Sequence, residues 1–73
     1  MDRSQAETEM LEGYREGLDM SNPEPGVNRS WSYRHGFANA RDDRRGQGPR
    51  DTAERLRALA SNCIAMDTGD YEL

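Results

Sequence analysis

Apolar residues return every three or four positions in three stretches of the chain, which is the periodicity of an amphipathic helix. The first stretch predicts a helix near residues 4–20, with Ser4 and Glu7 placed as a capping box at its start. Its expected apolar face consists of Met10, Leu11, Tyr14 and Leu18.

The second stretch follows a rigid connector. Pro23 and Pro25 fix their own φ and disfavour the α conformation before them, and Gly26 permits the chain to reverse, so the first helix should end near Ser21. A second helix over residues 29–45 is expected to start at a cap formed by Asn28 or Ser30. Its apolar surface would come from Trp31, Tyr33, Phe37, Ala38 and Ala40.

The third stretch follows a Gly- and Pro-rich linker at residues 46–50. A helix over residues 51–66, capped by Asp51 with Glu54 in the capping-box position, carries the most regular apolar stripe of the chain. The stripe comprises Ala53, Leu56, Leu59, Ala60, Cys63 and Ile64. Residues 67–73 are acidic, lack periodicity and are expected to fray. These patterns predict one all-α domain over residues 1–73: two helices joined by a Pro-containing turn, plus a third amphipathic C-terminal helix.

Two glycines on or beside the face of the first helix call for an explanation. Gly13 and Gly17 lie four residues apart, and each costs about 1 kcal/mol relative to alanine inside a helix. The structural interpretation is that the missing side chains let a second backbone or an aromatic ring approach closely. Contact with a partner is the alternative.

Length and composition argue against an enzyme. A chain of 73 residues hides only about 60% of its unfolded surface, which is too little for a deep core and a buried catalytic cleft. Cys63 and His35 are the only residues of their types, so we expect no intramolecular disulfide, metal site or cofactor, and a reducing cytoplasm is the simplest location. No leader pattern and no apolar run approaching about 18 residues is present, so no membrane association is expected.

Charge divides the chain into two candidate contact surfaces. Residues 1–21 carry a balance of −4, and residues 22–50 carry +3 with every basic residue an arginine. The candidate basic and aromatic surface comprises Arg29, Trp31, Tyr33, Arg34, Arg41, Arg44 and Arg45, and the alternative acidic face comprises Glu9, Glu12, Glu16 and Asp19. Arg41, Arg44 and Arg45 also have a purely structural interpretation, because cations near a helix C-terminus complement its dipole.

The order of several small motifs resembles a known family. They are Gly13-Tyr14-x-x-Gly17-Leu18, then Asn22-Pro23, then Arg29, then Tyr33, Gly36, Phe37 and Ala40 in an aromatic-x-x-Gly-aromatic-x-x-Ala pattern. Over residues 8–43 the chain resembles the ribosome modulation factor family, including its small phage- and plasmid-borne CrpP-like relatives. The resemblance implies two helices packed closely through Gly13, Gly17 and Gly36. The family usually has Trp at the position of Tyr33, so either Tyr33 or Trp31 takes that place.

Two functions remain open from the sequence. The first is a non-enzymatic binding protein that contacts ribosomal RNA, with arginines on phosphates and an aromatic residue stacked on a base, and that regulates translation. The second is an acidic inhibitor or adaptor of phage or mobile-element origin, such as an anti-CRISPR protein, that covers a basic nucleic-acid-binding surface of a host protein. A homodimer is also compatible with a partly covered third helix.

Overall fold

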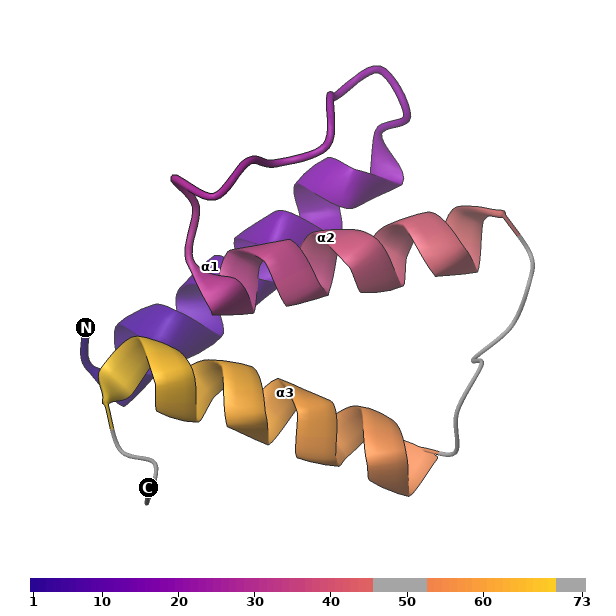
Figure 1. The fold of residues 1–73 in the computed structure, drawn as a ribbon. Coiled ribbons are helices and arrows are strands. Elements are labelled where there is room, and N and C mark those ends of the chain that lie inside the picture. The colour runs from indigo at the N-terminus through magenta and orange to yellow at the C-terminus, as the bar shows by residue number, and fades with distance from the viewer. Residues whose placement is uncertain (46–52, 70–73) are drawn as a thin grey trace.

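Three helices make up the fold. The computed structural model describes residues 1–45 and 53–69, and for residues 53–56 only the helical backbone. The helices are α1 (Arg3–Leu18), α2 (Trp31–Arg44) and α3 (Ala53–Thr68), and they are the only regular elements in the described part. Figure 1 shows α1 and α2 crossing, with α3 running back beneath α2. The predicted all-α class is therefore confirmed.

The ends of α1 differ from the prediction. Asp2 caps its start by accepting the Gln5 N–H at 2.8 Å, so the predicted Ser4–Glu7 capping box is wrong. Glu7 instead pairs with Arg3 at 3.2 Å on the exposed surface. The helix ends at Leu18, because the Asp19 carboxylate accepts the Ser21 N–H at 3.0 Å and hydroxyl at 2.7 Å and turns the chain before the first proline.

The start of α2 agrees with the prediction. The Ser30 hydroxyl accepts the Tyr33 N–H at 3.1 Å, so Ser30, and not Asn28, is the cap. Ser30 is three residues before the N–H that it binds, which is the local spacing of a helix N-cap.

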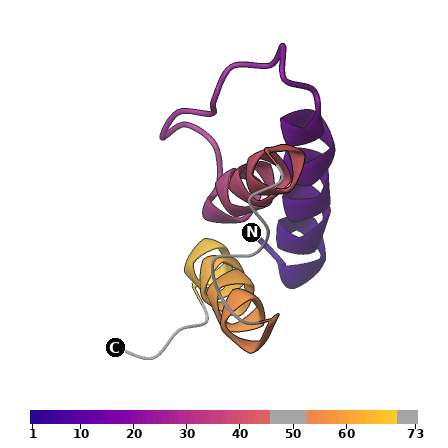
Figure 2. The same ribbon diagram turned by 90° about the vertical axis from the view of Figure 1, so that its right-hand side faces the viewer.

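Glycines set the distance between α1 and α2. A Cβ on Gly13 would lie 2.1 Å from the Tyr33 carbonyl oxygen, and a Cβ on Gly36 would lie 2.0 Å from that of Met10. Gly17 in turn faces the backbone of Phe37. Residue 13 contacts residue 33, and residue 17 contacts residue 37. The two helices therefore run in the same general direction, and the connector returns the chain to the end of the molecule where α1 begins (Figures 1 and 2). The structural interpretation of the glycines is confirmed.

The core is small and contains few large side chains. Phe37 is 2% exposed, and its ring centroid lies 6.2 Å from that of Tyr33. Among the residues that the structure describes, the other buried apolar side chains are Ala6, Ala40 and Ile64.

Several apolar residues that the periodicity placed inside are exposed. Leu11 is 65% exposed and Leu59 is 40% exposed; Trp31 and Ala38 also lie on the surface. The buried face of α1 is built from Ala6, Gly13 and Gly17, which lie on a different side of the helix from Leu11. Counting large apolar residues along the sequence does not reveal such a face, because two helices that pack this closely need small residues where they touch.

The last turn of α3 also differs from the prediction. Asp67 and Thr68 belong to the helix, so the prediction that residue 67 begins a frayed tail is wrong. Ile64 is buried, and Cys63, predicted to be buried, is only half-buried. The predicted linker at residues 46–50, the Asp51–Glu54 cap, the side chains of Ala53 and Leu56, and residues 70–73 of the predicted tail lie outside what the structure describes.

Candidate functional site

Trp31 is the exposed aromatic residue of α2. It is the first residue of the helix and is 45% exposed, and the Arg34 guanidinium lies 4.1 Å from its ring centroid. Arginine over an indole face is a favourable cation–π arrangement. The pair thus presents an aromatic surface beside a positive charge.

Tyr33 lies inside the fold. It is buried at the α1–α2 contact, and burial, followed by the nearby Glu16 carboxylate, raises the pKa of its phenol. The Arg29 guanidinium lies 3.8 Å from the centroid of the Tyr33 ring. The predicted use of Tyr33 as a surface for stacking on a base is therefore wrong, since its ring is already covered.

Arg41 is also buried. It is 7% exposed and donates to the backbone carbonyl oxygens of Asp19 at 3.2 Å, of Met20 at 3.4 Å, and of Asn22. Its guanidinium also lies 4.6 Å from the Phe37 ring centroid. Arg41 thus binds carbonyls at and just beyond the C-terminus of α1, and its predicted place on the contact surface is wrong.

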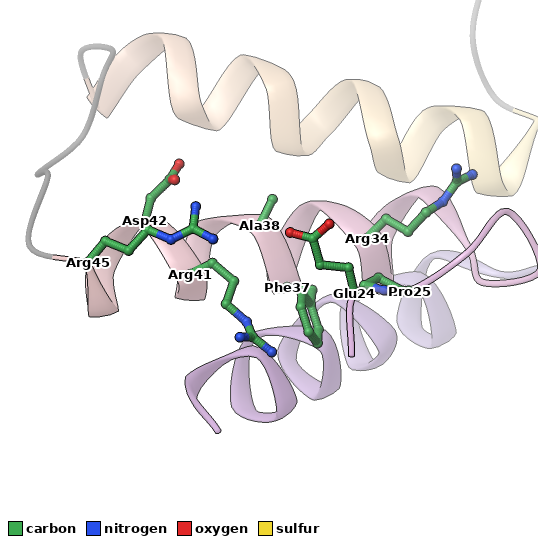
Figure 3. A pocket seen from close by; sticks show the side chains of 8 residues that line it. All are labelled: Glu24, Pro25, Arg34, Phe37, Ala38, Arg41, Asp42 and Arg45. Carbon is green, nitrogen blue, oxygen red and sulfur yellow. The ribbon is translucent and has the colours of Figure 1, made fainter. Parts of the chain in front are cut away.

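A hollow lies between the connector and α2, with a volume of about 240 Å³. Figure 3 shows its lining: Phe37 and Arg41 point toward α1, whereas Ala38 and Asp42 point away from it. Pro25 adds an apolar wall. The charged side chains that line the hollow are Glu24, Arg34, Arg41, Asp42 and Arg45. Three arginines against two carboxylates leave the hollow with a net charge of only +1, which is a weak basis for selecting an anion.

The fold thus separates the candidate basic and aromatic surface into buried and exposed residues. Arg34 is half-buried beside Trp31, and Arg44 and Arg45 are exposed at the far end of α2. Arg29 is exposed, but it lines a second hollow together with Glu9 and Glu12. Of the predicted surface, Trp31, Arg34, Arg44 and Arg45 belong to α2 or its C-cap and remain accessible, and we call these four residues the α2 surface.

The acidic residues of α1 form a stripe. Glu9, Glu12, Glu16 and Asp19 recur at helical spacing, and the last three line one shallow hollow with Arg15 and Asn22. Glu16 and Asp19 are exposed, whereas Glu9 and Glu12 are half-buried. Hydrogen bonds from the hydroxyl and N–H of Ser21 hold the pKa of Asp19 below its ordinary value. Asp19 therefore stays negatively charged at neutral pH.

Sequence reasoning missed Asp67. Its Oδ1 accepts the Trp31 N–H at 3.0 Å and its Oδ2 accepts the Ser32 N–H at 2.7 Å. A carboxylate at a helix N-terminus is favoured by unpaired N–H groups and by the helix dipole. No local signal could have identified it, because the partners are 36 and 35 residues apart in the chain.

The single histidine and the single cysteine lie at the margin of the core. His35 is half-buried, its buried Nε2 has no hydrogen-bond partner among the described residues, and burial lowers its pKa. Burial raises the pKa of the half-buried Cys63 thiol, which disfavours the reactive thiolate.

Within the described residues there is no group of three side chains suited to a metal ion. None of the helices described is both long and apolar enough to cross a membrane. The chain matches no protein-family model, no curated protein and no solved structure.

Proposed function

We propose that this protein is a small non-enzymatic binding protein of the cytoplasm that contacts ribosomal RNA through the α2 surface and thereby modulates translation. The observation that carries the proposal is the exposed Trp31 ring with Arg34 stacked on it. The order of motifs over residues 8–43, which resembles the ribosome modulation factor family, adds support.

The chemistry of the α2 surface suits unpaired RNA. An aromatic ring can stack on any base, and arginine binds phosphate oxygens through a planar set of donors. Arg34 covers part of the indole, so a base would stack on the part that remains exposed. Arg44 and Arg45 lie at the other end of the helix, about 20 Å from Trp31, and would bind phosphates several nucleotides along the strand.

The test is a titration of the full chain into fluorescently labelled single-stranded RNA, followed by anisotropy, and cosedimentation with ribosomal subunits. Stacking on one base contributes about 1–3 kcal/mol, so Trp31→Ala should weaken binding by roughly 5- to 150-fold. Reversing Arg34 and Arg45 to Glu should weaken it further and flatten its salt dependence.

The matched control is Arg57→Glu, which makes the same change of charge as Arg34→Glu, but at an exposed position of α3. It should weaken RNA binding much less than Arg34→Glu. Equal losses from the two variants would mean that only net charge matters, and the α2 surface would then have no specific role.

A second function is supported by the α1 stripe. Four carboxylates on one side of a helix fit a protein with a basic nucleic-acid-binding surface, which this chain would cover as an inhibitor. In this case, replacing Glu9, Glu12 and Glu16 with Lys should abolish capture of the host protein, whereas Trp31→Ala should leave it intact. RNA binding that survives the same three substitutions would favour the first function.

A further inference from the structure

The hollow between the connector and α2 combines an apolar lining with charges of both signs. Pro25, Phe37 and Ala38 are its apolar residues, and Glu24 and Asp42 are its two acids. Among the described residues that line it, neither carboxylate forms an ion pair with an arginine of the same hollow. The acceptors and donors around the hollow are therefore not paired with one another, and a ligand can use both.

The two carboxylates call for an explanation, because the hollow adjoins the α2 surface. Arg34 lines the hollow, and its guanidinium also lies 4.1 Å from the Trp31 ring centroid. A carboxylate beside a strand of phosphates weakens RNA binding by repulsion. The same carboxylate favours binding where it accepts hydrogen bonds from a base, since an ionised carboxylate is only an acceptor. The acids of the hollow thus suit the edge of a base, whereas its arginines suit phosphates.

Guanine is the base whose edge matches a carboxylate. Its N1–H and its N2 amino group point the same way from the Watson–Crick edge, so the two oxygens of one carboxylate can accept both. Adenine and cytosine place one amino donor beside a ring nitrogen that is an acceptor, and uracil places its one N–H between two carbonyl oxygens. The volume of the hollow, about 240 Å³, is below the range of about 300–1,000 Å³ for larger ligands and suits a single base.

Glu24 is better placed than Asp42 to contact a base. Pro23 and Pro25 flank Glu24 and restrict the backbone on both sides of it, so less conformational entropy is lost when a ligand binds. Figure 3 shows the Glu24 side chain extending from the connector toward Ala38 of α2, whereas Asp42 points away from α1.

We propose that this hollow is a guanine-binding site, in which Glu24 accepts the N1–H and N2 amino hydrogens of an unpaired guanine whose ring lies against Pro25 and Ala38. This inference rests on the proposed function and gives the α2 surface a base preference. The neighbouring base stacks on Trp31, and Arg34 binds the phosphate between the two nucleotides.

The first experiment titrates the full chain into short labelled uridine oligonucleotides that differ only in one central base, which is guanine, hypoxanthine or adenine. Hypoxanthine lacks the N2 amino group of guanine and so loses one of the two hydrogen bonds. A bidentate contact with a base discriminates by about 5- to 150-fold. Fluorescence anisotropy should show guanine bound more tightly than adenine by a factor in this range, with hypoxanthine between them.

Two variants separate base recognition from charge. Glu24→Gln and Asp42→Asn each remove one negative charge from the same hollow. Glutamine keeps the size of the side chain, but its NH₂ group is a donor and faces a donor of guanine. Glu24→Gln should therefore reduce the preference for guanine over adenine to less than about twofold, and Asp42→Asn should keep it. An equal rise in affinity for all three RNAs in both variants would show that only charge matters and would overturn the site.

An NMR titration with guanosine monophosphate tests the site without RNA. The nucleotide should shift the Glu24 and Ala38 amide signals in the wild type and not in Glu24→Gln, and adenosine monophosphate should shift them less. The Gly13 and Gly36 amide signals report whether α1 and α2 remain packed in each variant.

The outcomes distinguish this site from the proposed function. If RNA binds through Trp31 without a preference for guanine, the guanine site is refuted and the proposed function stands. If no RNA binds, the proposed function fails; shifts with guanosine monophosphate that Glu24→Gln abolishes would then still support the guanine site. If neither RNA nor the nucleotide binds, both proposals are refuted.

Discussion

A single methyl group at Gly36 should test the contact between α1 and α2. In the middle of a helix, Gly→Ala ordinarily stabilises by about 1 kcal/mol. Here the new Cβ would lie 2.0 Å from the Met10 carbonyl oxygen and 3.0 Å from the Tyr14 nitrogen. Both are backbone atoms of α1, so no side chain can rotate to make room, and the helices must separate.

The magnitude follows from that separation. Ordinary contact begins near 3.4 Å, so the carbon–oxygen distance must lengthen by more than about 1 Å. Overpacking of this kind costs about 1–3 kcal/mol, and the separation also loosens Phe37, whose burial depends on the close approach. We expect a net loss of about 2 kcal/mol, which lowers the melting temperature of a domain of this size by roughly 8–16 °C.

Thermal unfolding followed by far-UV circular dichroism measures this effect, and Gly26→Ala is the control. A Cβ at Gly26 meets only the Asn28 side-chain oxygen, at 3.1 Å, and that side chain can turn away. Gly26→Ala should change the free energy of unfolding by less than about 1 kcal/mol.

A double variant refines the test. Gly13→Ala and Gly36→Ala require the same separation of α1 from α2, so their combined cost should be smaller than the sum of the two single costs. A Gly36→Ala protein that melts above the wild type would refute the reasoning, because it would show that the helices do not depend on this close contact.

Three further predictions concern the core, the connector and pH. Phe37→Ala should cost about 3–5 kcal/mol, whereas Leu59→Ala, at a residue 40% exposed, should cost less than about 2 kcal/mol in chemical denaturation; equal costs would mean that the core is misassigned. Arg41→Ala removes a charged donor from three carbonyls and should cost about 1.5–3 kcal/mol, with faster hydrogen exchange in residues 19–22; unchanged exchange would contradict its capping role. Burial lowers the pKa of His35 below its ordinary 6.5, so the unfolded chain binds the proton more readily and the free energy of unfolding should fall as pH drops below about 6.5. The fall between about pH 7.5 and about pH 5 should be smaller in His35→Gln, and an identical fall in both proteins would exclude His35 as its cause.

Local chemistry explains what the sequence could predict. Ser30 caps α2 through an N–H three residues away, and α1 ends at the Asp19–Ser21 turn shortly before the prolines, so the helices could be placed to within a few residues. The glycines were informative for a similar reason. Each carries a known cost inside a helix, and the close backbone contact at Gly13 and Gly17 accounts for it.

Contacts between distant residues explain what the sequence could not predict. Arg41 resembles an ordinary end-of-helix arginine until α1 is placed beside it, and its buried position then removes it from the contact surface. Trp31 and Tyr33 are equivalent by composition, yet the crossing of α1 and α2 covers one and leaves the other exposed. The accessible part of the candidate site therefore depends on packing that helical periodicity does not encode.

The ends of the helices are completed by one another. Arg41 of α2 binds the carbonyls that follow α1, and Asp67 of α3 binds the first N–H groups of α2. Local caps such as Ser30 satisfy part of each end, but the bonds made by Arg41 and Asp67 form only when the next helix is in place. An isolated helix would leave those remaining polar groups to water. The helices therefore stabilise one another: loss of α3 would weaken the start of α2, and loss of α2 would weaken the end of α1. Such mutual dependence makes a domain of this size cooperative even though its apolar core is small.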